Sequence, residues 1–131
     1  MEKNEFVKRY QLMGGDAQDV VIPITIRANP LRYSPDELVK RLAAKKVVLK
    51  CIPYLAFGYE VVSSPFSLGS CEEHLLGYFY VQSAPAQIPS CILGPLKTDI
   101  VLDACASPGG KTTHLAEIMG NEGVVVALEK K

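Results

Sequence analysis

The 131-residue chain has no hydrophobic run that approaches the length of a membrane-spanning helix. Such a helix needs about 20 consecutive apolar residues, so we expect no membrane segment. The chain starts Met-Glu-Lys-Asn-Glu with no apolar stretch behind it, which argues against a secretory signal. It also lacks internal repeats and low-complexity tracts. Because 48% of the residues are hydrophobic, the composition favours a globular protein.

Cysteines are few and far apart, at Cys51, Cys71, Cys91 and Cys105, and they form no Cys-x-x-Cys pair. Zinc sites and disulfide frameworks usually show closer pairing, so we expect neither, and no other metal site. Free thiols are typical of a reducing compartment. We therefore expect a cytoplasmic protein.

The net charge is zero, but its distribution is uneven. Residues 1–50 hold ten Lys and Arg against six Asp and Glu, and the remainder holds four against eight. A basic half permits contact with a phosphate backbone. The alternative is a solvated helix face, and Lys40, Arg41, Lys45 and Lys46 fit that description.

Periodicity and turn residues predict a first unit of mixed helix and strand. We expect a short helix over 5–13, strands over 20–26, 47–52 and 59–62, and a helix from Ser34 to about Lys46. The helix start is well marked, because Ser34 can cap it, Pro35 suits its first position and acidic residues follow.

Residues 63–77 are rich in Ser, Gly and Pro and predict a loop between two units. Beyond it we expect an extended segment over 78–81, a helix over 84–93 and a strand–helix–strand unit over about 99–128. The pattern predicts an α/β protein: a small α+β module at 1–75, then the opening of a doubly wound parallel sheet at 76–131.

The chemistry of the chain is most visible in Asp103-Ala-Cys-Ala-Ser-Pro-Gly-Gly-Lys111, which follows an apolar strand and precedes a helix. Gly109 and Gly110 would let a charged ligand approach the backbone and permit positive φ angles. The helix would point its free N–H groups at that ligand. Glu129, at the end of the next strand, is placed to accept hydrogen bonds from ribose hydroxyls.

Two other interpretations of this loop stay open. Gly110-Lys111-Thr112 matches the tail of a nucleotide-binding P-loop, but that motif needs a glycine where Cys105 stands. A Gly-Gly turn could also simply join a strand to a helix. The acids that end both strands, Asp103 and Glu129, argue against that simpler interpretation.

The same nine residues resemble the Sun/Fmu family of RNA cytosine-5 methyltransferases (the RsmB/NOP-type enzymes), whose S-adenosylmethionine loop reads Asp-x-Cys-Ala-Ala-Pro-Gly-Gly-Lys. Only Ser107 departs from it. Three further segments are similar to the family's: 26–31 with the helix after it, 77–84, and 124–129, where the family more often has Asp than Glu129. The resemblance covers roughly residues 5–131.

The resemblance implies S-adenosylmethionine as cofactor and RNA, ribosomal or transfer, as partner. It implies that Glu129 holds the ribose and that Asp103 supports the loop or the cofactor's amino group. The methionine and ribose side would be lined by Cys105, Ala106, Ser107, Pro108, Gly109, Gly110 and Lys111. The first module would be an RNA-recognition-like (RRM/ferredoxin-like) domain, and the second an incomplete Rossmann-like sheet.

The family's two catalytic cysteines lie in Pro-Cys and Thr-Cys dipeptides, and this chain has neither. We therefore predict no catalytic residue here and expect the chain to be the N-terminal part of a longer enzyme, whose C-terminal portion could be encoded separately. We interpret Cys105 as a buried structural thiol. His74 and His114 are poor candidates for general bases, and we expect His114 to have a surface or packing role. The alternative functions are a non-catalytic RNA-binding remnant and a P-loop nucleotide-binding protein.

Overall fold

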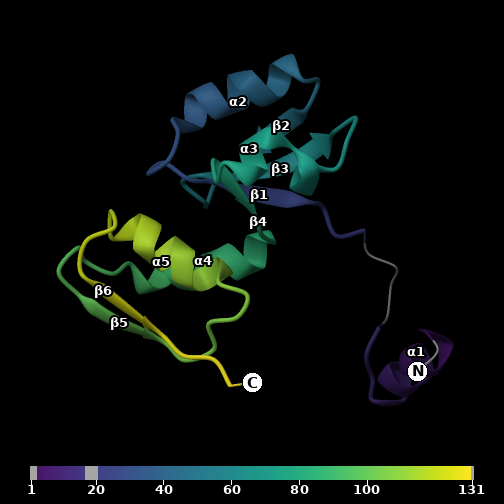
Figure 1. The fold of residues 1–131 in the computed structure, drawn as a ribbon. Helices are drawn as coiled ribbons and strands as arrows, with labels where there is room; N and C mark the ends of the chain where they lie inside the picture. The colour runs from purple at the N-terminus through teal and green to yellow at the C-terminus, as the bar shows by residue number, and fades with distance from the viewer. Residues whose placement is uncertain (1–2, 17–20, 131) are drawn as a thin grey trace.

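The computed structural model describes residues 3–16 and 21–130, which form a mixed α/β structure with two sheets (Figure 1). The strands are β1 (Thr25–Ala28), β2 (Val48–Cys51), β3 (Gly58–Ser63), β4 (Phe79–Val81), β5 (Ile100–Asp103) and β6 (Val124–Ala127). The helices are α1 (Lys3–Leu12), α2 (Pro35–Ala44), η1 (Leu68–Ser70), α3 (Glu72–Leu75), α4 (Ala84–Leu93) and α5 (Gly110–Ile118).

The first sheet is antiparallel, with strand order β2-β3-β1-β4. Helix α2 begins at Pro35 as expected and carries acidic residues in its first turn, but the side chain of Ser34, at the N-cap position, makes no capping hydrogen bond. Its Leu38 and Leu42 are fully buried. They pack in one core with residues of the sheet, of η1 and of the following turn: Ile26, Ala28, Val47, Tyr59, Leu68, Cys71 and Phe79.

Two expectations for this region are wrong. Residues 63–77 are not a linker, because they contain η1 and α3, and both Leu68 and Cys71 are buried in the first core. The expected strand over 20–26 lies instead at Thr25–Ala28; residue 20 is outside the described part, and 21–24 are exposed and not in a strand. The Ser, Gly and Pro content conceals the few apolar residues that anchor 63–77.

Strand β4 pairs with β1, with Ile26 opposite Val81 and Ala28 opposite Phe79. It therefore completes the first sheet, although it lies beyond the boundary at residues 75 and 76 that we predict from the sequence. The division of the chain into domains stays a prediction. In chain order the elements of this sheet run β-α-β-β-α-β.

Both faces of β1 are covered, since all four of its residues are buried. Ile26 and Ala28 face the core under α2. On the other face, the Arg27 side chain bonds to residues of α5. Gly58 of β3 lies close to Gln87 of α4 on the same face, since a Cβ added to this glycine would stand 3.1 Å from the Gln87 side-chain oxygen. Helices α4 and α5 therefore lie against the second face of the antiparallel sheet (Figure 1).

The second sheet consists, in the described residues, of the parallel pair β5 and β6. Val101 packs on Leu115 of α5 and on Met119, the residue after this helix. The opposite face is apolar and exposed, with Ile100 77% and Leu102 60% accessible. That face continues over Val124, Val126 and Leu128. The expected helix over 84–93 is confirmed as α4, which accommodates Pro89 and ends at the left-handed Gly94.

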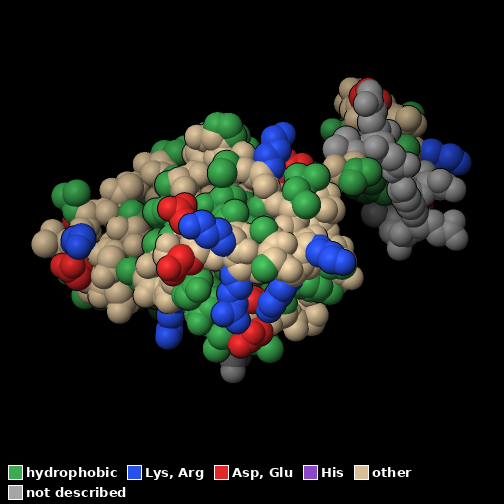
Figure 2. All heavy atoms as spheres, turned by 90° about the horizontal axis from the view of Figure 1, so that it is seen from above, with side chains coloured by type: hydrophobic (Ala, Val, Ile, Leu, Met, Phe, Trp, Pro, Cys, Tyr) green, Lys and Arg blue, Asp and Glu red, His purple; other side chains and the backbone are tan. Residues whose placement is uncertain are grey.

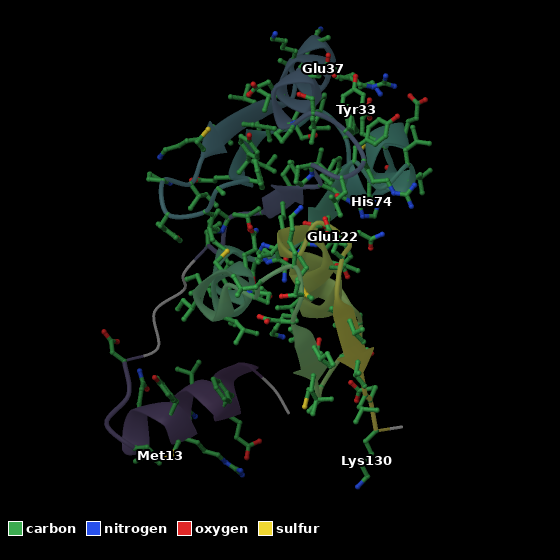
Figure 3. The ribbon with its side chains drawn as sticks, turned by 90° about the vertical axis from the view of Figure 1, so that its left-hand side faces the viewer. Met13, Tyr33, Glu37, His74, Glu122 and Lys130 are labelled. Carbon is green, nitrogen blue, oxygen red and sulfur yellow. The ribbon has the colours of Figure 1, made fainter. Side chains whose placement is uncertain are left out.

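Helix α1 lies apart from the rest of the molecule (Figure 1). Figure 3 shows the same separation, with Met13 just past its end and Lys130 beyond β6. Within residues 3–16 and 21–130, no helix is both long and apolar enough to cross a membrane.

Candidate cofactor site

The loop over residues 104–109 joins β5 to α5 and lies against the segment that follows β6. The parallel register places Asp103 opposite Ala127. Two backbone bonds continue this contact: the Leu128 N–H donates to the Asp103 carbonyl at 2.8 Å, and the Ala106 N–H donates to the Leu128 carbonyl at 3.0 Å. The loop and the end of β6 therefore form one continuous surface.

Glu129 lies beside this loop, as the sequence predicts. Its Oε2 accepts a hydrogen bond from the Ser107 N–H at 2.8 Å. A carboxylate offers about four acceptor positions, so Glu129 can accept further bonds. Its position joins the loop to the second strand of the parallel sheet.

Asp103 holds the loop in place through hydrogen bonds of its carboxylate. Its Oδ2 accepts the Thr112 hydroxyl at 2.6 Å, and its Oδ1 accepts the Cys105 N–H at 3.2 Å. Thr112 belongs to the first turn of α5, so one carboxylate connects the end of β5, the loop and the helix.

The two glycines have different roles. Gly109 has φ +102°, and a Cβ placed on it would meet nothing within 4 Å. It thus supplies both the left-handed turn and the open backbone that we expect. Gly110 starts α5 without a positive φ, and its Cβ would lie 3.3 Å from side-chain atoms of Tyr80 and Gln82. The expectation of an unobstructed ligand path is wrong for Gly110, which is instead packed against the protein.

The remaining predicted residues are mostly at the surface. Cys105, Ser107, Pro108 and Lys111 are exposed, and Ala106 is half-buried. The interpretation of Cys105 as a buried thiol is wrong, because this residue stands past the end of β5, in the loop; Cys71 is the buried cysteine.

Neither histidine is part of this surface. His114 on α5 is 7% exposed, and its Nε2 lies 3.8 Å from the Cys91 sulfur. Burial, and then the positive charge of Arg27, lower the pKa of His114 to about 4. The ring of His74 lies against Phe79, with centroids 5.4 Å apart. The expected packing role of His114 is confirmed.

The residues present fit the polar end and sugar of a nucleoside cofactor. The first N–H groups of a helix have no acceptor within it, and α5 begins directly after the open backbone at Gly109. The adjoining cavity, between β5, α4 and α5, measures about 160 Å³. Enclosed ligand sites usually measure about 300–1,000 Å³, so the described residues supply one wall of a site.

Sequence reasoning missed the residues that seat this wall on the antiparallel sheet: Arg27, Tyr80, Gln82 and Thr113. Their contacts with Arg27, and that of Arg27 with Glu117, join residues 53 to 90 positions apart in the chain, and such distances leave no local pattern. One signal was available. Arg27 lies between two apolar residues inside a short strand, which is a costly position for an unpaired cation.

Comparison with known proteins identifies the family. Residues 90–131 match the family model described as 16S rRNA methyltransferase RsmB/F. Over 109 residues the chain is 39% identical to ribosomal RNA small subunit methyltransferase F of Vibrio parahaemolyticus, covering 80% of this chain and 23% of that protein. The chain belongs to the Sun/Fmu (RsmB/NOP-type) family of RNA cytosine-5 methyltransferases.

A second relative has similar identity over nearly the same part of the chain. The 26S rRNA (cytosine-C(5))-methyltransferase nsun-1 of Caenorhabditis elegans is 36% identical over 113 residues, which are 86% of this chain and 17% of that protein. The chain thus spans about a quarter or less of the curated relatives it matches.

Two solved structures share the fold. A methyltransferase homolog from Pyrococcus horikoshii superposes with a TM-score of 0.79 at 39% identity, over 83% of this chain and 36% of that one. NSun6 from Pyrococcus horikoshii, solved with SFG, gives a TM-score of 0.77 at 20% identity, over 85% and 52%.

Proposed function

We propose that this chain carries the S-adenosylmethionine loop and the RNA-guiding module of an RNA cytosine-5 methyltransferase acting on ribosomal or transfer RNA. The carrying observation is that the glycine loop and the acid of the second strand lie side by side, with Ser107 N–H donating to Glu129 at 2.8 Å. Relatives named as rRNA methyltransferases support the substrate class.

In this proposal each residue acts through its observed position. Glu129 accepts the ribose hydroxyls, while the open backbone at Gly109 admits the methionine end of the cofactor. Asp103 keeps the loop in place through Thr112. When bound, S-adenosylmethionine supplies an electrophilic methyl group on a sulfonium.

The chain alone is expected to transfer no methyl groups. Carbon five of cytosine is a weak nucleophile, and a cysteine thiolate must first add to the ring. The residues before the four cysteines are Lys50, Ser70, Ser90 and Ala104, so neither family dipeptide is present. An assay with unmodified RNA tests this directly, and robust turnover by the purified chain would show that catalysis needs nothing more.

We infer that the first sheet is the RRM/ferredoxin-like module. Its β-α-β-β-α-β order and the sheet order β2-β3-β1-β4 support this. The face that such modules commonly offer to RNA bases is covered at β1 and β4, because Arg27 and Tyr80 face α5. RNA is therefore expected to lie beside the sheet.

Basic residues of the α2 surface are paired with acidic residues, which supports placing the RNA elsewhere. Arg41 of α2 and Lys45, the residue after this helix, bind Glu73 at 2.6 and 2.5 Å, and Glu72 lies beside them. Figure 2 shows the resulting surface, with acidic side chains among the basic ones and no continuous basic patch. A groove with cavities of about 580 and 510 Å³ runs between the first sheet and α5, and the exposed Arg32 lines both. We place the RNA backbone there.

Calorimetric titration with S-adenosylmethionine tests the cofactor assignment. The Glu129→Gln variant should bind at least about tenfold more weakly, since hydrogen bonds to a charged group contribute about 1.5–3 kcal/mol. Glu122→Gln is the matched control, because Glu122 is exposed on the turn before β6 and pairs with Lys97. Equal affinity of wild type and Glu129→Gln would contradict the ribose role.

The same preparation separates the alternatives. RNA binding without cofactor binding would favour a remnant with a vestigial loop. Magnesium-dependent binding of ATP or GTP would favour the P-loop interpretation, which neither other function predicts.

A further inference from the structure

Arg27 crosses from the antiparallel sheet to the helix that carries the cofactor loop. It lies on β1, is 1% exposed, and contacts α5 at three residues. Its Nε and Nη2 bind the two oxygens of Glu117 at 2.7 and 2.9 Å. Nη1 donates to the Gly110 carbonyl at 2.9 Å, and Nη2 donates to the Thr113 hydroxyl at 3.1 Å.

The guanidinium is also held from its own sheet. Nη1 donates to the side-chain oxygen of Gln82, and the Tyr80 ring lies 5.5 Å from Cζ. A guanidinium has five N–H donors in a fixed planar arrangement. Five hydrogen bonds to four residues hold this one, so the position of α5 is set relative to the sheet in more than one direction.

These contacts reach the loop itself. The Thr113 hydroxyl that accepts from Arg27 donates to the Gly109 carbonyl at 2.9 Å, and the Thr113 N–H donates to the same carbonyl at 2.9 Å. Gly109 is the residue with the positive φ. The chain of bonds from Arg27 thus ends at the bend of the loop, one residue before α5.

Separating Arg27 from Glu117 would be unfavourable in free energy. Glu117 has a side chain only 9% exposed, and burial raises its pKa while Arg27 opposes that rise. A shift of α5 away from β1 would leave a buried cation and a buried carboxylate without partners. In Figure 3, Tyr33 and His74 lie on the side of the antiparallel sheet, and Glu122 lies near the place where α5 meets it.

We propose that Arg27 is a positioning residue for cofactor binding, which fixes the bend at Gly109 through Thr113 and the Gly110 carbonyl. The antiparallel sheet then takes part in cofactor affinity without touching the cofactor. This inference rests on the proposed function of the loop.

The first test measures the loop in the ligand-free chain by amide hydrogen exchange. In Arg27→Gln, the N–H groups of Gly109 and Thr113, which donate to Ala106 and Gly109, should exchange at least about tenfold faster. Thr113→Val removes the hydroxyl link with no change of charge and should act in the same direction if Arg27→Gln does not fold. Unchanged exchange in both variants would overturn the proposal.

The control is Arg41→Gln. Arg41 also binds two glutamates, Glu72 and Glu73, but between α2 and α3. It should leave exchange at Gly109 and Thr113 within about twofold of wild type. Equal acceleration in the control and in Arg27→Gln would show general loosening of the fold and would also overturn the proposal.

The second test is S-adenosylmethionine affinity by calorimetry, at a temperature where circular dichroism shows each variant to be folded. Arg27→Gln should bind at least about tenfold more weakly, Arg27→Lys should be intermediate because an ammonium has three donors, and Arg41→Gln should match wild type. Equal affinity of wild type and Arg27→Gln would refute the proposal. If wild type binds no cofactor while exchange still responds to Arg27, the proposed function fails and the positioning of the loop stands.

Discussion

In the antiparallel sheet the central strand β1 has all four residues buried, whereas in the parallel pair β5 has one, Val101. The first region packs strands, α2 and α3 around its own core. The second packs a small cluster on α5 and leaves the opposite apolar face open to water. It is joined to the first region by Arg27 on one side of α5. This difference underlies our proposal that the loop over residues 104–109 depends on the neighbouring region for its position.

The largest expected effect compares two leucines. Leu42 is fully buried under the first sheet, and Leu102 is 60% exposed on the second. Leu42→Ala should lower the free energy of unfolding by about 4 kcal/mol, within the range for buried leucines, and Leu102→Ala by less than about 1 kcal/mol. Urea unfolding measures both. Similar losses would show that the open face is covered in solution.

Acid should weaken the second region first. The pKa of His114 falls from 6.5 to about 4 on folding, so the folded state favours the neutral ring. The corresponding stability is complete above pH 6.5 and lost as pH falls toward 4, a loss of about 3 kcal/mol. His114→Gln should remove this pH dependence in urea midpoints between pH 6.5 and 4. A wild-type midpoint that does not change over that interval would contradict the prediction.

The first region should respond at lower pH. Burial alone would raise the pKa of Glu73, but hydrogen bonds from Lys45 and Arg41 outweigh it and hold the value at about 2. Its stability is therefore present above pH 4.5 and lost as pH falls toward 2. Glu73→Gln should lower the free energy of unfolding by about 2 kcal/mol at neutral pH, which is the contribution of hydrogen bonds to a charged group. It should also remove the pH dependence of stability between pH 4.5 and 2. Amide hydrogen exchange, followed separately in β1 and in β5, measures the stability of each region.

The smallest effect on stability is expected at the open face. Ile100→Lys should change the free energy of unfolding by less than about 0.5 kcal/mol, because Ile100 is 77% exposed. It should nevertheless reduce any association of two chains through this face, since a charge on an apolar edge strand opposes pairing with a second chain. Sedimentation velocity is the measurement, with Lys50→Gln on the exposed side of β2 as a control. If Ile100→Lys associates as strongly as wild type, the contact between chains does not involve this face.

Local chemistry made part of this structure predictable. The strand–loop–helix–strand unit and Glu129 beside the loop follow from apolar runs and turn residues that are close in sequence. The start of α2 at Pro35 follows from the residues at its first turn. These signals are complete within about 30 residues, so they need no knowledge of tertiary contacts.

The rest depended on distant pairing. Nothing near Phe79–Val81 indicates that it joins β1, and a Ser- and Gly-rich stretch hides Leu68 and Cys71 under the first sheet. Distant pairing also explains the uneven distribution of charge along the chain. Arg27 and Arg41 in the basic half bind Glu117, Glu72 and Glu73 in the acidic half, so internal ion pairs account for part of what could be taken for an RNA-binding surface.

The separation of Arg27 from Glu117 has a consequence for synthesis on the ribosome. All strands of the antiparallel sheet have been made once residue 81 is added, but the carboxylate that neutralises Arg27 follows it by 90 residues. At about 5–20 residues per second, synthesis of the chain from Val81 to Glu117 takes roughly 2–7 s, and during that time the sheet carries a charged side chain on the face that α5 later covers. Hydration of that cation keeps the unfinished face in contact with water until α5 emerges, so docking of α5 is a late event in the life of the new chain.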